Sequence, residues 1–314
     1  MNNNLISSFF IRTLLFFFKK EDGVFSNFHT NDFSSFQICF DLSDTKYIHF
    51  GDILFFLPLI NLLSKNKTIF IKISGNQSNF INTFLMYKKK IKFTYDYLDN
   101  NNVVYIGSPY CLPKNIISRK YVGIGFFSNN YSLSYPLLII KKLFSFMHID
   151  VKEDVIISNF IFFKQFIRNK LNKKSNFNNT KNYFIVSPYI ASGRFRDLFH
   201  FKQKKIIEHA KMNSNKNLVP IIIGSMRDHN ITLNFEHINL KGKSIIEVIQ
   251  IASKQNIMFG IGFDNFWMHF FDLIGKDYKV FFRGRFFKKN MLIHMNSINV
   301  SFIDDVRRKE YLNL

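Results

Sequence analysis

YIHFGDILFFLPLINLLSKN at Tyr47–Asn66 and IMFGIGFDNFWMHFFDLIG at Ile257–Gly275 share one layout, and together they decide the expected fold. Each reads as an apolar strand, a glycine turn that carries an aspartate, and an apolar helix. In an open α/β sheet, ligands bind where strands end and helices begin, because helix N-termini offer unpaired amides and a favourable dipole. The sequence therefore predicts two nucleotide-fold halves, each with a carboxylate at the end of a strand.

Strand-length and helix-length apolar segments alternate along the rest of the chain. This alternation predicts right-handed crossovers and parallel sheets, and a chain of 314 residues suits two domains. The polar run NKLNKKSNFNNTK at 169–181 is the best candidate for a linker. We therefore expect an α/β protein with two Rossmann-like domains, residues 31–168 and 182–314, that face each other across a cleft. Strands are expected at 46–50, 68–73, 91–95, 103–106, 121–126, 183–187, 218–224, 237–240, 256–260 and 278–282, and helices at 53–64, 78–89, 137–147, 202–211, 244–253 and 265–274.

The charge balance favours anionic partners without choosing among them. The chain has 43 Lys+Arg against 22 Asp+Glu, which gives a formal charge of +21 at pH 7. Such a balance suits phosphates, nucleic acid or anionic lipid, and a solvated basic surface explains it equally well. No basic block is long enough for a nucleic-acid tail, and aromatic and basic residues do not interleave as in RNA-recognition motifs. We expect no nucleic-acid partner.

Other classes of site lack their sequence patterns. Only Cys39 and Cys111 occur, which excludes a disulfide framework and a cysteine zinc site and suits a reducing cytoplasm. There is no phosphate-binding P-loop, no Gly-x-Ser-x-Gly elbow and no His-Glu-x-x-His spacing. There is no Asp-x-Asp either, so we expect neither a metal nor another cofactor.

Residues 1–30 form an N-terminal apolar segment with two open interpretations. LISSFFIRTLLFFFKK at Leu5–Lys20 is interrupted by Arg12 and two serines, and is too short and too polar for a spanning helix. It also lacks the cleavage pattern of a signal peptide. We expect a helix that lies on the inner face of the membrane, with Lys19 and Lys20 toward lipid head groups, or a helix that packs on the protein's own core.

Two motifs resemble those of the heptosyltransferase-like glycosyltransferases of bacterial lipopolysaccharide synthesis, the glycosyltransferase family 9 type. HFGDILFFLP at His49–Pro58 is similar to the family's opening Gly-Asp motif. KGKSIIEVIQIASKQNIMFGIGFDNFWMHFFDLIG at Lys241–Gly275 is similar to its C-terminal signature. The resemblance implies the GT-B fold, in which two Rossmann-like domains enclose the substrates. The residues at matching positions of the second motif are Ser244, Glu247, Asp264, Met268 and His269.

The resemblance implies that Asp52 is the catalytic base. Attack of a sugar hydroxyl on an anomeric carbon needs a carboxylate within hydrogen-bond reach of that hydroxyl, which agrees with this role. The alternative is that Asp52 only caps a helix that begins at Ile53.

The resemblance also implies a donor site in the second domain. The loop at Asp264 and the helix that follows would hold the diphosphate through backbone amides, near His269. Asn265, Phe266 and Trp267 replace the family's Thr-Gly-Pro. The remaining candidates are Ser187 after the first strand, Arg196 or Arg194 in place of the family's lysine beside the diphosphate, and Asp228 toward the ribose hydroxyls, with exposed surface residues as the alternative.

The function implied is inverting transfer of a sugar, heptose or similar, from a nucleotide-diphosphate donor to a lipopolysaccharide or other surface-glycan acceptor. We expect a cytoplasmic protein, and contact with the inner face of the membrane stays open with the two interpretations of the N-terminal segment. Two alternatives stay open. One is a nucleotide-sugar epimerase of the same architecture, and the other is a degenerate relative that binds glycolipid without catalysis.

Overall fold

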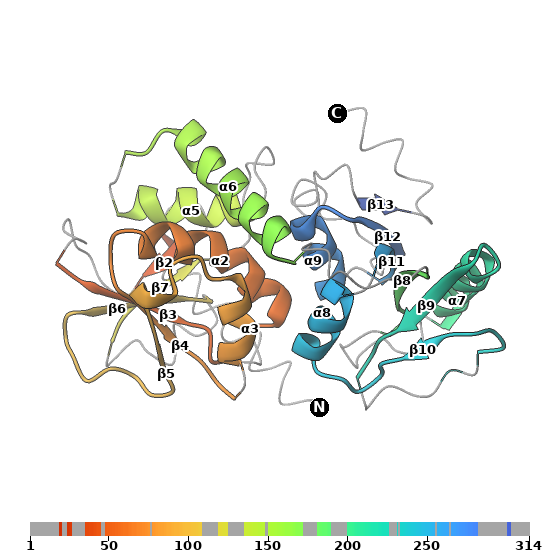
Figure 1. Ribbon diagram of the computed structural model, residues 1–314. Helices are drawn as coiled ribbons and strands as arrows, with labels where there is room; N and C mark the ends of the chain where they lie inside the picture. The colour runs from red at the N-terminus through yellow and green to blue at the C-terminus, as the bar shows by residue number, and fades with distance from the viewer. Residues whose placement is uncertain are drawn as a thin grey trace. The chain divides into compact units, whose positions relative to one another are not determined.

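The computed structural model divides the chain into two compact α/β units (Figure 1). Among the described residues, those up to Phe163 form the first unit and those from Lys164 onward form the second. The domain boundaries expected at residues 168 and 182 stay predictions. The structure describes residues 19–20, 24–26, 35–44, 48–75, 77–108, 119–124, 135–147, 150–171, 181–189, 200–225, 231, 233–254, 256–263, 265–281 and 300–302.

The first unit is built on a seven-stranded sheet of order β1-β2-β7-β6-β3-β4-β5. Strands β3 to β7 are parallel, and β1 and β2 add an antiparallel edge. The parallel strands therefore follow the doubly wound order, in which the chain turns outward in both directions from β3 and β6. The strands are β1 (Lys19–Lys20), β2 (Val24–Ser26), β3 (Gln37–Asp41), β4 (Ile69–Lys72), β5 (Ile91–Thr94), β6 (Val103–Gly107) and β7 (Lys120–Ile124).

Helix α2 (Phe50–Ser64) follows β3 and is buried on almost all sides, and every residue from Ile53 to Asn61 is buried. It packs between the sheet and α5 (Figure 1). An apolar surface around the whole helix is typical of such a central position. The other helices of this unit are α3 (Gln77–Phe84), the short 3₁₀ helix η2 (Lys88–Lys90), α5 (Tyr135–Phe146) and the first part of α6 (Glu153–Leu171).

The strand expected at 46–50 is wrong. Ile48 and His49 belong to no strand, and Phe50 is the first residue of α2; residues 45–47 lie outside the described part. The strand before α2 is β3, which ends at Asp41, nine residues before Phe50. Ile48 and Phe50 instead stand at the start of α2, on either side of its N-cap His49. The segment from Leu42 to His49 connects β3 to α2.

The N-terminal segment also differs from the expectation where it is described. Lys19 and Lys20 form β1, which pairs with Phe25 and Val24 of β2, so a helix does not extend through Lys20. Residues 1–18 lie outside the described part. No described helix is long and apolar enough to cross a membrane.

Helix α6 was not predicted, because its large apolar residues fall on several faces. Its residues from Lys164 onward belong to the second unit. There Lys164 pairs with Asp272 of α9 at 3.4 Å, and Arg168 lies against Gly275 at the C-terminal end of α9. The helix ends at Leu171, so it includes the first three residues of the expected linker. Residues 172–180 lie outside the described part.

The second unit is built on a fully parallel sheet of order β10-β9-β8-β11-β12-β13. This is the 3-2-1-4-5-6 order of the dinucleotide-binding fold. Its elements are β8 (Asn182–Ser187), α7 (His200–Ser214), β9 (Leu218–Ile222), β10 (Ile238–Asn239), α8 (Ile245–Lys254), β11 (Ile257–Phe263), α9 (Phe266–Ile274), β12 (Asp277–Phe281) and β13 (Val300–Phe302).

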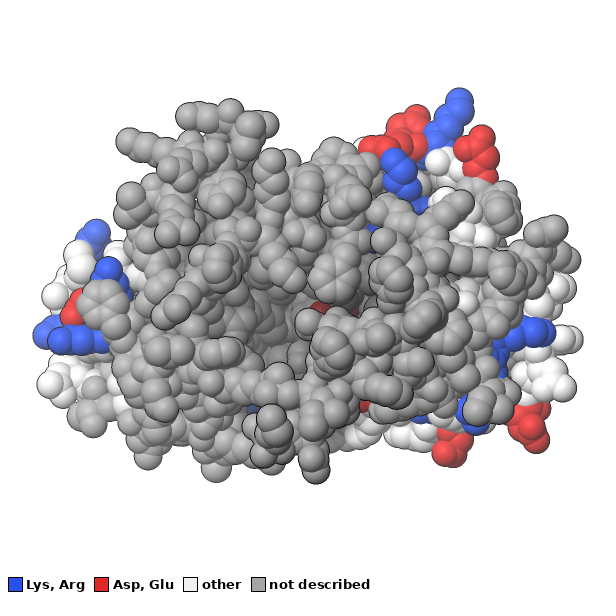
Figure 2. Space-filling view, turned by 180° about the vertical axis from the view of Figure 1, so that it is seen from behind, with Lys and Arg blue, Asp and Glu red and all other residues white. Residues whose placement is uncertain are grey.

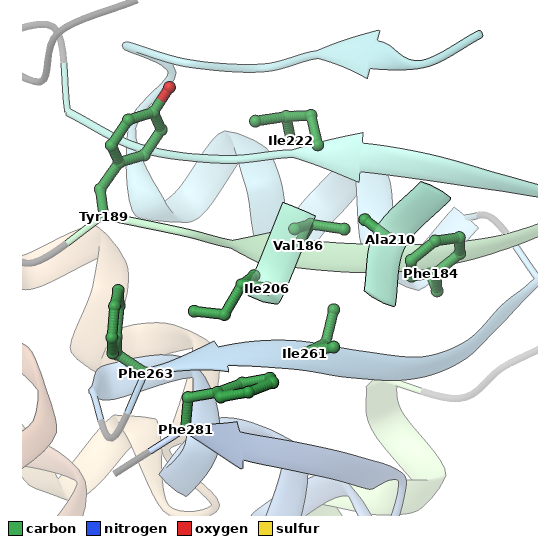
Figure 3. Packing of buried hydrophobic residues seen from close by; sticks show 9 residues of the cluster. All are labelled: Phe184, Val186, Tyr189, Ile206, Ala210, Ile222, Ile261, Phe263 and Phe281. Atoms are coloured by element: carbon green, nitrogen blue, oxygen red, sulfur yellow. The ribbon is translucent and has the colours of Figure 1, made fainter. Parts of the chain in front are cut away.

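Alternate residues of the central strands build a closed apolar layer beneath α7 (Figure 3). Phe184 and Val186 of β8 lie in register with Phe259 and Ile261 of β11, so they share one face. Ile206 of α7 is fully buried against them. The residues that alternate with them, Ile185 and Ser187 in β8 and Gly260 and Gly262 in β11, face the opposite side of the sheet, where α9 packs.

Substituting Asn61 by alanine should destabilise the first unit. The buried Asn61 amide donates to the carbonyl oxygens of Leu57 (2.8 Å) and Phe84 (3.2 Å) and accepts from the Met86 N–H (2.7 Å). Asn61→Ala leaves these groups unpaired, at a cost of about 1–3 kcal/mol. Urea unfolding should show a lower midpoint with an unchanged slope.

Asn79→Ala is the matched control, because Asn79 lies on the exposed side of α3. Equal losses of stability in the two variants would contradict a stabilising role for the hydrogen bonds from Asn61 to Phe84 and Met86.

Candidate functional site

The second unit brings Ser187 and Asn265 together at the point where its strand order reverses. From β8 the chain proceeds outward to β9 and β10, and from β11 outward to β12 and β13. In doubly wound sheets, the crevice outside the carboxyl ends of two such strands is where ligands bind. Ser187 is the last residue of β8, and Asn265 follows β11 by two positions. Both residues were predicted as donor-site residues.

Asn265 links the two strand ends through both atoms of its side-chain amide. Its Nδ2 donates to Ser187 Oγ at 2.9 Å, and its Oδ1 accepts the Trp267 N–H at 3.0 Å as the N-cap of α9. The Met268 N–H bonds to the Asn265 carbonyl oxygen at 3.2 Å. Two of the backbone amides at the start of α9 are therefore hydrogen-bonded to Asn265. Fewer amides at this helix end are left to bind a diphosphate.

Glycines make the close approach of these strands possible. A Cβ on Gly262 would lie 2.4 Å from the Ser187 carbonyl oxygen and 2.6 Å from Tyr278 Oη. A Cβ on Gly260 would lie 2.5 Å from the Tyr278 ring. Close packing therefore explains the two glycines of the GIG sequence in β11, because larger residues there would push β8 and β12 away from this strand.

Phe266 and His269 lie in the first turns of α9. Phe266 stacks on Phe270 with ring centroids 5.9 Å apart and meets Trp267 edge to face. His269 is partly buried. The other predicted donor residues, Arg194, Arg196, Asp228 and Asp264, lie outside the described residues, and their roles stay predictions.

Ser244 and Glu247, which match the resembling motif, form the capping box of α8. The Ser244 N–H donates to Glu247 Oε2 at 2.8 Å, and the Glu247 N–H donates to Ser244 Oγ at 3.2 Å. These hydrogen bonds lower the pKa of Glu247. The pair starts the helix that leads into β11, which is a structural role.

In the first unit, Asp52 lies in the first turn of α2. His49 is the N-cap, and Asp52 Oδ2 accepts the His49 backbone N–H at 2.8 Å. Within the described part of the chain, Asp52 Oδ1 has no hydrogen-bond partner. The cap therefore uses only one of the two carboxylate oxygens of Asp52.

The electrostatic setting of Asp52 suits a proton acceptor. Burial raises the pKa of the Asp52 carboxyl, and the hydrogen bond from the His49 N–H and the charge of His49 oppose this shift. The side chain is only partly buried, so it keeps access to solvent or a ligand. A carboxylate with a raised pKa is a better base at neutral pH than an ordinary one.

The loop to Asp52 starts at the strand-order reversal of the first sheet, between β3 and β6. Asp41 ends β3 and lies in register with Gly107, which ends β6. A Cβ on Gly107 would lie 2.7 Å from the Asp41 carbonyl oxygen, so glycine permits the close approach. The two units thus place their candidate residues at equivalent points of their sheets.

Sequence reasoning missed a buried polar network under this loop. Asp41 accepts hydrogen bonds from Ser43 Oγ (2.7 Å) and Tyr97 Oη (3.1 Å), and Lys72 Nζ lies 3.9 Å away while it donates to Ser43 Oγ (2.6 Å). Lys72 Nζ and the Arg119 guanidinium lie 4.2 and 3.8 Å from the Tyr97 ring centroid. The network anchors the first residues of the loop. The sequence signal that could have indicated this network is that a charged residue, Asp41 or Lys72, ends each of two apolar strands.

Among the described residues, no three His, Cys, Asp or Glu side chains lie close enough to hold a metal ion. The independence of metal and of other cofactors stays a prediction, because residues outside this part of the chain carry further carboxylates and histidines.

Comparison with known proteins yields similar structures but no similar sequences. No protein-family model and no curated protein matches the chain. The glycosyl transferase family 9 structure from Veillonella parvula DSM 2008 is 12% identical, with a TM-score of 0.54 over 90% of each chain. The E. coli ADP-heptose lps heptosyltransferase II is also 12% identical, with a TM-score of 0.51 over 88% of this chain and 97% of that one.

The chain has a GT-B fold. The expected α/β class is thereby confirmed, while the facing of the two domains across a cleft stays a prediction. The likeness to these two structures concerns the fold alone.

Two substitutions of Asn265 should measure how much its side-chain hydrogen bonds contribute to stability. Asn265→Ala removes the cap and the bond to Ser187, and should lower the free energy of unfolding by about 1–2 kcal/mol. Asn265→Asp keeps an acceptor for the Trp267 N–H and an acceptor for the Ser187 hydroxyl, so stability should be nearly retained. Chemical denaturation measures both. Equal losses in the two variants would rule out the cap as the main contribution.

Proposed function

We propose that this protein is an inverting glycosyltransferase that moves a sugar, heptose or similar, from a nucleotide-diphosphate donor to a lipopolysaccharide or other surface-glycan acceptor. The observation that carries the proposal is the setting of Asp52 in a chain with a GT-B fold. Its carboxylate lies on the first turn of the helix that follows β3, with one oxygen held and the other without a partner among the described residues.

The reaction would be a direct displacement. An acceptor hydroxyl gives its proton to Asp52 as its oxygen forms a bond to the anomeric carbon. The bond from that carbon to the diphosphate breaks, and the electron pair leaves with the diphosphate. Inversion at the anomeric carbon follows because the nucleophile and the leaving group occupy opposite faces.

The second unit would hold the donor. The Ser187–Asn265 pair lies at the strand-order reversal, where nucleotides bind in sheets of this order. With Trp267 and Met268 amides engaged inside α9, neutralisation of the departing diphosphate would depend more on side-chain cations. Arg196, with Arg194 second, is proposed for that role, Asp228 for the ribose hydroxyls, and the Asp264 loop with Phe266 and His269 for the rim of the site.

Two alternatives differ in simple readouts. A nucleotide-sugar epimerase would convert the donor without any acceptor, so product analysis with and without a glycan separates it. A non-catalytic glycolipid-binding relative is favoured by the engaged amides at the start of α9. Titration calorimetry with nucleotide-diphosphate sugars decides this case, since the absence of binding to every donor would favour it.

Asp52→Asn should lower the rate of sugar transfer about 10²–10⁴-fold, the usual contribution of a positioned general base. Donor affinity should change little, because the donor is assigned to the other unit. Single-turnover transfer, read by the mass of the acceptor, measures the first quantity, and calorimetry measures the second.

Asp96→Asn is the control, because Asp96 is an exposed acid of the same unit. Wild-type turnover by Asp52→Asn would exclude this carboxylate as the base and leave the fold assignment intact.

The pH dependence of transfer should report the raised pKa of Asp52. The base acts only when ionised, so kcat/KM should fall as the pH decreases through that pKa. Because burial shifts this pKa upward, the acidic limb should lie at a higher pH than an ordinary aspartate would give. The limb should disappear from the residual activity of Asp52→Asn, and its persistence there would assign it to another group.

A further inference from the structure

A buried pair of opposite charges lies at the carboxyl ends of two adjacent strands in the first unit. Asp41 ends β3, Lys72 ends β4, and the two residues lie opposite each other in the register of these strands. They are only 1% and 8% exposed. By contrast, the described charged residues in Figure 2 lie at the surface, where basic and acidic side chains stand close together in small groups.

Stability alone does not explain this burial. Taking two charges out of water costs about as much free energy as their attraction returns, so a buried ion pair often adds little over an apolar pair of similar size. Strands β3 and β4 are already joined by their backbone ladder and by a buried apolar core. A buried ion pair can instead hold one particular arrangement of the chain, and the contacts of Ser43 show which arrangement that is.

The pair holds the first residues of the loop from Leu42 to His49. Lys72 Nζ donates to Ser43 Oγ at 2.6 Å, and Ser43 Oγ donates to Asp41 Oδ1 at 2.7 Å. The Leu42 N–H donates to the Lys72 carbonyl oxygen at 2.9 Å, and Gln77 Nε2 donates to the Leu42 carbonyl oxygen at 3.2 Å. These bonds to β4 and α3 fix the direction in which the loop leaves the sheet.

A further hydrogen bond carries this order to the start of α2. The Ile48 N–H donates to the carbonyl oxygen of Asp44, the residue after Ser43, at 2.9 Å. This bond bridges residues 45–47, which lie outside the described part of the chain. His49 follows the buried Ile48 and has the extended backbone of an N-cap, with φ −98° and ψ 170°. Its N–H therefore lies outside the hydrogen-bond ladder of α2, and the loop sets its direction.

The His49 N–H in turn orients the carboxylate of Asp52. It donates to Asp52 Oδ2 at 2.8 Å, which is the one hydrogen bond that this carboxylate accepts among the described residues. The buried helix fixes the backbone of Asp52, but it does not fix the rotation of the side chain. The direction of the carboxylate consequently depends on the loop before the helix.

We propose that Ser43, held by the buried pair of Asp41 and Lys72, positions the Asp52 carboxylate for proton transfer through the loop that ends at His49. This inference rests on the proposed function. A misplacement of about 1 Å between reacting groups can cost roughly 10²-fold in rate, so a loop can control the rate without contact with a substrate. Ser43 is a positioning residue, because its hydroxyl takes no part in the displacement itself.

The test compares Ser43→Ala with Ser43→Thr in the full chain. Alanine removes the hydroxyl that links Lys72 to Asp41, whereas threonine keeps it. Ser43→Ala should lower kcat about ten-fold, with little change in the KM of the donor, and Ser43→Thr should recover most of the loss. Substitution of Lys72 is less informative, because it leaves Asp41 buried without its counter-charge and destabilises the whole unit.

Ser74→Ala is the matched control. Ser74 follows β4 at the same edge of the sheet and is partly buried like Ser43, but its hydroxyl lies 3.5 Å from Gln77 Oε1 and is not bonded to the Asp41–Lys72 pair. This variant should transfer sugar like the wild type.

The pH profile separates positioning from a general loss of stability. The hydrogen bond from the His49 N–H lowers the pKa of Asp52. A loosened loop weakens this bond, so the pKa of Asp52 rises in Ser43→Ala. Because the base acts only when ionised, the acidic limb of kcat/KM should move to higher pH in this variant. A smaller folded fraction would reduce the rate and leave the limb in place.

Amide hydrogen exchange follows the loop without any substrate. The Ile48 and His49 amides should exchange about ten-fold faster in Ser43→Ala than in the wild type, while the amides of Leu57 to Ile60 keep their rates. Unchanged exchange at the two loop amides, an unmoved acidic limb, or a loss of rate that Ser43→Thr does not recover would each overturn the proposal. An equal loss in Ser74→Ala would do the same. Absence of transfer by the wild type would instead contradict the proposed function, and exchange at His49 would still show whether Ser43 holds the loop.

Discussion

The burial of α2 is the constraint on which the rest of the first unit depends. The helix is apolar on all sides, so it is stable only between the sheet and a second layer of helix. Once the helix is placed there, the positions of both its ends relative to the sheet are fixed. Its first turn, with Asp52, must lie at the carboxyl edge of the sheet, and its last turn must lie at the amino edge, near the start of β4. A charged residue anywhere between Ile53 and Ile60 would be buried without a partner.

Strand order then explains why the candidate residues of both units lie at equivalent places. Each sheet reverses its order between two strands whose carboxyl ends carry polar groups, Asp41 beside Gly107 in the first unit and Ser187 beside Gly262 in the second. Glycine on the neighbouring strand brings the backbones close in both cases. The similarity is one of geometry, because the first unit fills its reversal point with a buried ion pair and the second with a neutral hydrogen bond.

Apart from α6 and β13, which were not predicted, the longer elements from Thr68 onward could be predicted to within about five residues, because their apolar periodicity reflects the faces they bury. The first strand could not. QICFD is short and carries polar residues at both ends, whereas Ile48 to Phe50 offers a more apolar run, and only the pairing of β3 with β4 and β6 decides between them. The Ser187–Asn265 bond joins residues 78 positions apart, so it depends on packing that local pattern does not contain.

The replacement of Thr-Gly-Pro by Asn265, Phe266 and Trp267 can be understood from these contacts. Asparagine is as good an N-cap as threonine, so the start of α9 is preserved. Gly262 and Gly260 inside β11 let β8 and β12 pack closely against it, which does not depend on the residue at position 266. Phe266 stacks on Phe270 along the helix, so it needs no special backbone conformation. The start of α9 thus keeps a polar N-cap side chain, and the two positions after it carry aromatic side chains in place of glycine and proline.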